Sequence, residues 1–293
     1  MTLNQAQEQG LLFTLVNNAL RAASEAHDQL GRAGIERMPK AANQFGDAPL
    51  VIDFEAEEAV LASMNEFCAA YAVSIRIFSE EHGIVEIGVS PYDYTVFLDG
   101  IDGSYICLHE YGTGRYATML GMFKGEDPAY GDALVSGIEE HATGRFFGAA
   151  KGAGAFVFQG GLPIRLTGSG SVHLTPQTRI YTDMYMPLER QTYHKEFEGR
   201  FPHLVNDTHC SAINYTDLLL GAGDVVVESM AKKQDLEKLV AYLLIIEAGG
   251  YVLDSQGNSL EDQKCLSPGA EERLMIAAAT ASLAREVKDY LAA

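Results

Sequence analysis

The sequence predicts a mixed α/β protein in two halves, and two observations carry this prediction. Four apolar runs, separated by glycine, Asp-Pro and Thr-Gly turn signals, follow one another at 115–124, 132–140, 144–149 and 153–158, which indicates an antiparallel meander. Beyond them, helical and extended patterns alternate, as in layered α/β proteins. We therefore expect an N-terminal α+β half over 1–165 and a C-terminal α/β half over 166–293, forming one large domain or two intimate ones.

The N-terminal half begins with two helical patterns. Residues 3–30 are rich in Ala, Leu, Gln and Glu, with apolar residues at helical spacing. A second helix is expected from Asp53, as its N-cap, to Tyr71. Residues 74–78 alternate like a strand, and the glycine-rich stretch 160–163 closes this half.

The C-terminal half contains shorter segments. The patterns predict strands at 179–185, 224–228, 251–253 and 274–278, and helices at 189–199, 211–222, 235–247 and 281–291. The helix 235–247 has the most continuous apolar stripe and ends at a pair of glycines.

The charge balance restricts the binding partners. The formal net charge is −19, which argues against a nucleic-acid partner because phosphate backbones are bound by Lys and Arg. An acidic protein with an anionic substrate needs a local positive charge, which metal ions would supply.

The compartment follows from the cysteines and the N-terminus. The four cysteines are scattered without a C-x-x-C pair, as expected of free thiols in a reducing cytosol. The N-terminus lacks the pattern of a signal peptide, and no apolar run approaches the length of a membrane span. We expect a cytoplasmic protein with no membrane contact.

The stretch 97–104, Phe-Leu-Asp-Gly-Ile-Asp-Gly-Ser, is the strongest chemical signal. An apolar strand delivers Asp99 and Asp102 into a turn containing two glycines. Carboxylates at the end of a buried strand need a partner, and a hard cation such as Mg²⁺ takes oxygen ligands. The bland alternative is a plain hairpin turn, because Asp-Gly is a common turn signal.

The spacing of the two aspartates separates this stretch from a known catalytic pair. Haloacid-dehalogenase phosphatases use D-x-D, which places both carboxylates on one face of an extended chain, whereas D-x-x-D does not. The spacing here therefore suits a turn that wraps around metal ions. The sequence also lacks a phosphate-binding P-loop, a serine nucleophile elbow and a zinc-protease motif.

Further acids gain meaning beside this pair. Glu80 ends a strand, Asp53 starts a helix and Asp235 starts another, where the helix dipole favours a carboxylate. Each has a bland interpretation, since Asp53 and Asp235 are also ordinary helix caps. Glu228, at the end of a short apolar strand, either is solvated or points into the site.

In this combination the sequence resembles the inositol monophosphatase family. The family's Asp-Pro-Ile-Asp-Gly-Thr appears as residues 99–104, and its Gly-Glu-Glu as 79–81. Its Trp-Asp, followed by a helix and Glu-Ala-Gly-Gly, appears as residues 234–235 and 247–250. The resemblance covers about residues 50–255, and it implies a layered α-β-α-β-α sandwich of the inositol monophosphatase and fructose bisphosphatase type.

The resemblance also implies a metal centre. Glu80, Asp99 and the Ile101 carbonyl would hold one Mg²⁺, and Asp99, Asp102 and Asp235 a second, with two or three ions per site. As catalytic residues, Glu80 and the Ser104–Asp53 pair would orient the attacking water and accept its proton.

The implied substrate site is less complete. Gly103 and Ser104 would hold phosphate oxygens, Glu228 would bind substrate hydroxyls, and His209 would contact the substrate. The chain departs from the family at Gly100 (Pro), Ser104 (Thr) and Gln234 (Trp). It also lacks the arginine that many members carry in the segment 206–211.

The resemblance implies Mg²⁺-dependent, lithium-sensitive hydrolysis of a small phosphate monoester, most simply inositol monophosphate or a related polyol or sugar phosphate, by a homodimer. Fructose 1,6-bisphosphate, histidinol phosphate and adenosine 3′,5′-bisphosphate remain alternative substrates. A non-catalytic homologue that binds metal or phosphoinositide is the alternative of another class.

Overall fold

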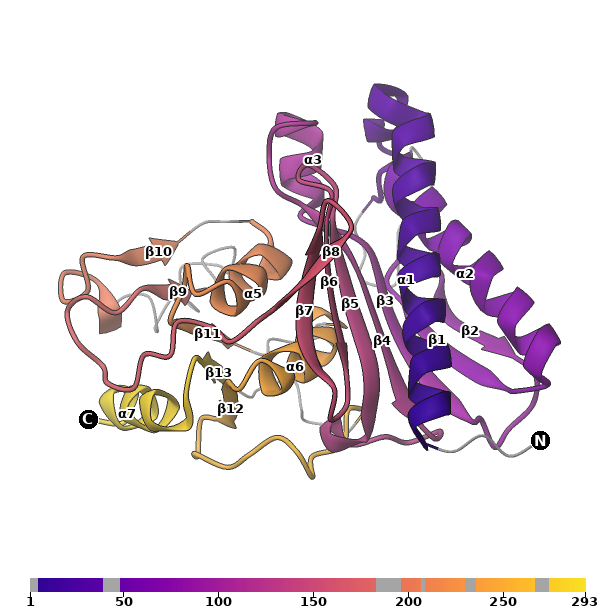
Figure 1. The fold of residues 1–293 in the computed structure, drawn as a ribbon. Helices are drawn as coiled ribbons and strands as arrows, with labels where there is room; N and C mark the ends of the chain where they lie inside the picture. Colours follow the sequence, from indigo (N-terminus) through magenta and orange to yellow (C-terminus); the bar gives the residue numbers. More distant parts are fainter. Residues whose placement is uncertain (1–4, 39–47, 183–195, 207–208, 230–235, 267–273) are drawn as a thin grey trace.

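The chain folds into five alternating layers of helices and sheets. The structure, a computed structural model, describes residues 5–38, 48–182, 196–206, 209–229, 236–266 and 274–293. Helices α1 (Gln5–Leu30) and α2 (Val51–Tyr71) cover one face of the first sheet, and helices α5 (Ser211–Leu219) and α6 (Leu236–Glu247) lie between its other face and the second sheet (Figure 1). Helix α7 (Ala281–Leu291) packs on the outer face of the second sheet.

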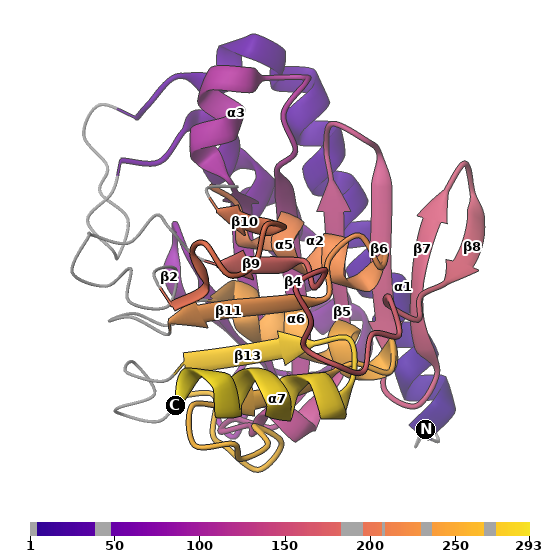
Figure 2. The same ribbon diagram turned by 90° about the vertical axis from the view of Figure 1, so that its left-hand side faces the viewer.

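The first sheet has eight strands in the order β2-β1-β3-β4-β5-β6-β7-β8. Only β1 and β3 are parallel neighbours, and β3 to β8 form a meander in which every pair is antiparallel. Figure 2 shows β2 and β8 at the two edges of this sheet. The strands are β1 (Ile75–Ser79), β2 (Gly83–Ile87), β3 (Tyr94–Asp102), β4 (Ala117–Lys124), β5 (Ala133–Glu140), β6 (Arg145–Ala150), β7 (Gly154–Gln159) and β8 (Leu162–Arg165).

The second sheet has five strands in the order β10-β9-β11-β13-β12. Strand β9 is parallel to both of its neighbours, while β13 runs antiparallel to β11 and β12. The strands are β9 (Ile180–Thr182), β10 (Leu204–Asn206), β11 (Val225–Ser229), β12 (Tyr251–Asp254) and β13 (Leu274–Ala278).

Strand β3 is buried along its whole length because both of its faces are covered. Its side chains alternate between two apolar cores. Val96 and Leu98 join the core beneath α1 and α2, whereas Phe97 joins the central core with α5 and α6. A third core lies between the second sheet and α7. Asp99 and Asp102, at the end of β3, therefore lie between the helical layer of α1 and α2 and that of α5 and α6.

Most predicted elements are confirmed, with two corrections near the site. Asp53 is not the N-cap of the second helix, because α2 begins at Val51 after the N-cap Leu50. Asp53 instead occupies the third helical position, where its carboxylate accepts a hydrogen bond from the Leu50 N–H at 2.9 Å. The stretch after Leu98 is also no turn, since β3 continues to Asp102.

Other differences concern short elements. The patterns did not indicate β2, β8, β10 or helix α3 (Ser104–Glu110). The predicted helix 189–199 and the end of the predicted strand 179–185 lie largely outside the described residues. None of the described helices combines the length and the apolar composition needed to cross a bilayer.

A buried carboxylate joins the meander to the central helices. Glu140 of β5 is fully buried and accepts hydrogen bonds from Arg115 at 2.7 Å and from Arg145 at 2.6 and 3.0 Å. Arg115 also pairs with Asp217 of α5 at 2.7 Å. Burial alone would raise the pKa of Glu140, but its bonds to Arg115 and its other donors outweigh burial and lower it.

Glu140→Gln should therefore destabilise the protein substantially. The substitution takes the Glu140 carboxylate from Arg145 and leaves Arg115 with Asp217 as its acidic partner. Removing one partner of a buried ion pair costs about 3 kcal/mol. The measurement is the free energy of unfolding from urea denaturation.

Glu86→Gln is the matched control, because Glu86 pairs with Arg76 at 2.9 Å while its side chain is 45% exposed. An exposed pair of this kind contributes less than about 1 kcal/mol. Equal stability losses in the two variants would contradict the role given to Glu140.

Candidate active site

An irregularity in β3 places Asp99 and Asp102 on the same side of the sheet. Asp99 pairs with Met119 and Asp102 with Ala117, so three steps along β3 match two steps along β4. This extra residue is a bulge, and it cancels the alternation that would point the two side chains to opposite faces. Both carboxylates consequently face the layer that contains α5 and α6.

Gly100 and its carbonyl hold the bulge against its neighbours. A Cβ atom at Gly100 would lie 2.4 Å from the Asp53 carbonyl oxygen, so only glycine fits beside α2 in this arrangement. On the other side, the Thr118 hydroxyl of β4 donates to the Gly100 carbonyl at 2.6 Å. The bulge is thus clamped between α2 and β4.

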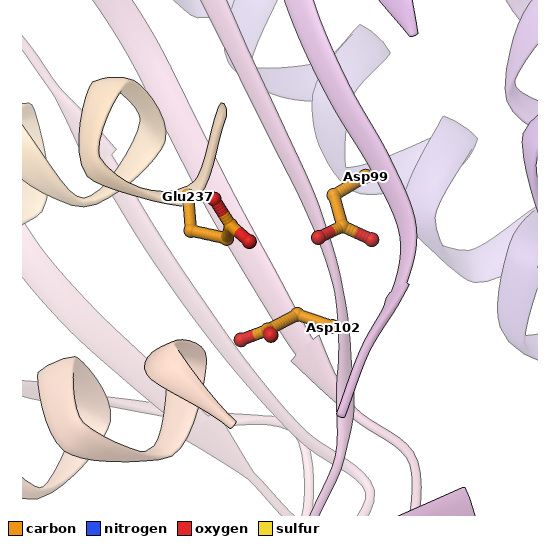
Figure 3. A group of neighbouring side chains, drawn as sticks. All are labelled: Asp99, Asp102 and Glu237. Atoms are coloured by element: carbon orange, nitrogen blue, oxygen red, sulfur yellow. The ribbon is translucent and has the colours of Figure 1, made fainter. Parts of the chain in front are cut away.

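A third acid completes a compact group. One carboxylate oxygen from each of Asp99, Asp102 and Glu237 lies within 4.8 Å of the other two. Figure 3 shows the three side chains converging from β3 and from the first turn of α6. Asp235, the predicted ligand from this helix, lies outside the described residues.

The group has the electrostatics of a cation site. Asp99 is 1% exposed, and its Oδ1 has no hydrogen-bond partner among the described residues. Burial raises the pKa of Asp99, and the nearby carboxylates of Glu80, Glu237 and Asp102 raise it further. A buried oxygen without a donor, surrounded by like charges, needs a positive partner.

Glu80 approaches the same group from the end of β1. Its carboxylate is, after burial, the largest contribution to the raised pKa of Asp99. The pKa of Glu80 itself is raised by burial and then by Glu237. Its backbone N–H donates to the Leu98 carbonyl at 3.1 Å, which continues the pairing of β1 with β3.

Asp53 and Ser104 lie on the other flank of the bulge. The Ser104 hydroxyl is 2.9 Å from the Ile101 carbonyl oxygen and 3.2 Å from Asp53 Oδ2. Burial raises the pKa of Asp53 to about 8, and its Oδ1 has no hydrogen-bond partner among the described residues. Gly103, just before α3, has a φ of +91°, which glycine adopts without strain.

The N-terminus of α5 closes the site on the side of Asp102. The Asp102 carboxylate accepts a hydrogen bond from the Ala212 N–H, and the Cys210 thiol lies 3.4 Å from its Oδ2. Burial raises the pKa of Asp102 to about 6, although the Ala212 N–H opposes the shift. Asp102 therefore caps a helix from another part of the chain.

Glu228 is not solvated, so that alternative is wrong. It is 1% exposed and shares a face of β11 with Val226, which belongs to the central core. Its carboxylate accepts hydrogen bonds from the Tyr215 hydroxyl at 2.5 Å and from the Asn214 amide at 3.2 Å, both on α5.

His209 precedes α5 in a strained conformation. Its φ is +51°, a region that residues other than glycine rarely adopt. Its ring lies 4.5 Å from that of Tyr105, the residue after Ser104. The structure thus places His209 near the predicted phosphate-binding residues.

The donor set fits a hard divalent cation. The side chains of Asp99, Asp102, Glu80 and Glu237 offer only carboxylate oxygen atoms as ligands. Carboxylates are the ligands that Mg²⁺ and Mn²⁺ prefer. The orphaned Asp99 Oδ1 is the atom that most clearly requires such an ion.

The structure brings together most of the predicted residues and adds one. Asp99, Asp102, Glu80, Asp53 and Ser104 lie around the end of β3 and so form the group that the motifs predict, although the motifs predicted a turn there and not a bulge. Glu237 was missed, although an acid in the first turn of the strongest predicted helix, two residues after Asp235, was a usable signal.

Comparison with known proteins defines the class. The fold is that of a class of metal-dependent phosphatases, and the acidic group could hold a metal ion. The chain belongs to the inositol monophosphatase family, which it matches over residues 8–291. This confirms both the resemblance and the layered fold.

Several relatives support the assignment. The chain is 27% identical to a fructose-1,6-bisphosphatase/inositol-1-monophosphatase of Thermococcus kodakarensis, over 75% of this chain and 74% of the relative. It is 24% identical to a bifunctional NADP phosphatase/NAD kinase of Methanococcus maripaludis, over 71% of this chain and 37% of that protein.

Solved structures share the fold. The extragenic suppressor protein suhB from Bartonella henselae superposes with a TM-score of 0.73 at 19% identity, covering 95% of this chain and 97% of that one. An IMPase from Thermotoga maritima gives a TM-score of 0.70 at 20% identity, covering 96% of each chain.

Asp99→Asn should abolish tight metal binding without unfolding the protein. Loss of an outer partner of a metal ligand already costs ten- to a hundredfold in affinity, so loss of this central carboxylate should cost more than about a hundredfold. Removing one of several crowded carboxylates relieves repulsion, so the melting temperature of the metal-free variant should not fall. Mn²⁺ titration and thermal denaturation measure the two quantities, and unchanged Mn²⁺ affinity would make Asp99 a purely structural residue.

Proposed function

We propose that this protein is a Mg²⁺-dependent phosphatase that hydrolyses a small phosphate monoester, with inositol monophosphate or a related polyol or sugar phosphate as its substrate. The observation that carries the proposal is the convergence of Asp99, Asp102 and Glu237 around a buried carboxylate oxygen without a donor. Membership of the inositol monophosphatase family supports the reaction class.

The ligands come from three separate elements. Asp99, Asp102, Glu80 and Glu237 would hold Mg²⁺, with Asp235 and the Ile101 carbonyl as further ligands implied by the family. Bound Mg²⁺ supplies a water of lowered pKa and a counter-charge for the leaving oxygen.

The remaining residues position the reactants. Asp53 and Ser104, 3.2 Å apart, form a hydrogen-bonded pair that would orient the attacking water and take its proton, and Glu80 would assist from the opposite flank. Gly103 and Ser104 would hold phosphate oxygens. Catalysis would then rest on positioning and charge, as phosphoryl transfer allows.

The substrate would extend toward α5. The Glu228 carboxylate is near enough to Asp102 for its charge to add to the effect of burial on the pKa of Asp102, and the His209 ring lies against that of Tyr105 near the start of α3. A carboxylate beside the phosphate site suits a ligand with hydroxyl groups better than one with a further phosphate. This favours a polyol monophosphate over fructose 1,6-bisphosphate and the other bisphosphates.

Membership of the family also suggests the location, the oligomeric state, the metal content and an inhibitor of the enzyme. We propose a cytoplasmic homodimer with two or three Mg²⁺ ions per site, inhibited by lithium. The separation into residues 1–165 and 166–293 would place most metal ligands in the first part, and Asp235 and the substrate residues in the second.

Phosphatase activity should depend completely on a divalent cation. The ligand set contains only oxygens, so chelation should abolish hydrolysis of p-nitrophenyl phosphate and excess Mg²⁺ should restore it. Full activity in excess chelator would contradict the metal mechanism. Mg²⁺ binding without hydrolysis of any monoester would instead favour the non-catalytic homologue.

Glu228→Gln should lower kcat/KM for inositol monophosphate by about ten- to a hundredfold, since hydrogen bonds to a charged acceptor contribute about 1.5–3 kcal/mol. Hydrolysis of p-nitrophenyl phosphate should hardly change, because this ester has no hydroxyls to lose. Steady-state kinetics on both substrates measures the difference.

Tyr215→Phe is the matched control, because it removes a donor to Glu228 while keeping the carboxylate. If Glu228 serves only to anchor α5, the two variants should lose activity equally on both esters. That result would assign substrate selection to the segment around His209.

A further inference from the structure

Glu57 is a buried acid that the reaction scheme above does not use. It lies one helical turn after Asp53 on α2 and is fully buried, although acids are rarely buried without partners. Its neighbours along the buried helix face are apolar, Ala56 and Val60. The polar contacts of Glu57 therefore explain why it is buried. These contacts lie in a single turn, which follows β1.

That turn is residues 79–82, which carries Glu80. The Glu57 carboxylate accepts hydrogen bonds from the N–H groups of Glu80 at 3.0 Å and Glu81 at 3.2 Å. It also accepts from the Ser79 hydroxyl and lies 2.7 Å from His82 Nδ1. Both oxygens are engaged, so the turn is folded around this one side chain.

The chain has residues suited to this arrangement. Ser79 stands where the family has glycine, and its hydroxyl donates to Glu57 while accepting from the His82 N–H at 3.0 Å. His82 also reaches the Glu58 carboxylate with Nε2 at 2.8 Å, and Glu58 is about half exposed. His82 thus bridges the buried carboxylate of Glu57 and the partly exposed carboxylate of Glu58.

Glu57 also contacts the bulge of β3. A Cβ atom at Gly100 would lie 2.9 Å from Glu57 Cγ, in addition to its clash with the Asp53 carbonyl. The same side chain therefore touches the ends of both parallel strands, β1 with Glu80 and β3 with Asp99. A change in its position would alter the separation of these two acids.

We propose that Glu57 is a positioning residue that holds Glu80 at the distance from Asp99 required for metal binding. It acts through the turn and touches neither metal nor substrate. The proposal deepens the function proposed above and rests on it for the identity of the metal site.

Glu57→Gln tests the proposal with little change in shape. The amide keeps one acceptor oxygen but turns an NH₂ group toward donors, either the two N–H groups or the Ser79 and His82 pair, so the turn must shift. Mn²⁺ affinity, measured by electron paramagnetic resonance of the free ion, should fall about tenfold, the usual effect of losing an outer partner of a metal ligand. The Mg²⁺ concentration for half-maximal activity should rise similarly, while kcat at saturating Mg²⁺ stays close to that of the wild type.

Glu58→Gln is the matched control, because it makes the same change at the next residue of α2. Glu58 contacts the outer nitrogen of His82, and no other polar partner of its side chain is found in the part of the chain that the structure describes. The substitution should leave Mn²⁺ affinity unchanged. Equal effects in the two variants, or wild-type affinity in Glu57→Gln, would overturn the proposal.

Ser79→Ala serves if Glu57→Gln fails to fold. It removes one donor to Glu57 and should weaken Mn²⁺ binding severalfold at temperatures where the protein stays folded, whereas wild-type affinity would count against the proposal. The two proposals fail separately. If the wild-type protein binds Mn²⁺ but hydrolyses no monoester, the proposed phosphatase activity is refuted. The role of Glu57 is then still decided by the Mn²⁺ affinities of the variants.

Discussion

The repulsion among buried carboxylates at the end of β3 is the constraint on which the rest of the structure depends. Asp99, Asp102 and Glu80 converge with Glu237 where burial raises the pKa of the first three acids and so disfavours their charged forms. Without a cation such a group would separate or take up protons. The surrounding elements keep it together: the bulge, the clamp on Gly100, the cap that Asp102 forms on α5, and the turn folded around Glu57.

This arrangement explains why the acids come from three different elements. A single helix or strand could not bring four carboxylates to one point, because its side-chain directions are set by its own period. The ends of β1 and β3 and the starts of α5 and α6 meet at the seam between the first sheet and the central helices. The salt-bridge network of Glu140, Arg115 and Asp217 ties the same two layers together at another point of the seam.

Sequence reasoning found the parts of the site that are local in the chain. The stretch 99–104 holds two acids, two glycines and a hydroxyl within six residues, and the resemblance ordered the remaining motifs around it. It could not find the bulge, because the D-x-x-D spacing predicts opposite faces on a regular strand and nothing in the sequence marks the extra residue. Glu57 escaped for another reason: an acid in a helix is usually solvated, and only the packing of the layers shows where this side chain points. Glu237 has a sequence signal in its place in the first turn of α6, but the packing is what brings it to Asp99 and Asp102.

The buried cysteine thiols offer a way to detect motion at the seam between the first sheet and the central helices. All four cysteines are buried thiols, and burial raises the pKa of each. Because only an exposed thiolate reacts with alkylating reagents, the folded protein should resist labelling. Cys210 lies between Asp102 and the start of α5, so its rate of alkylation would measure how often that helix lifts away from β3. The alkylation rate of this one thiol thus measures local opening of the site in the wild-type protein.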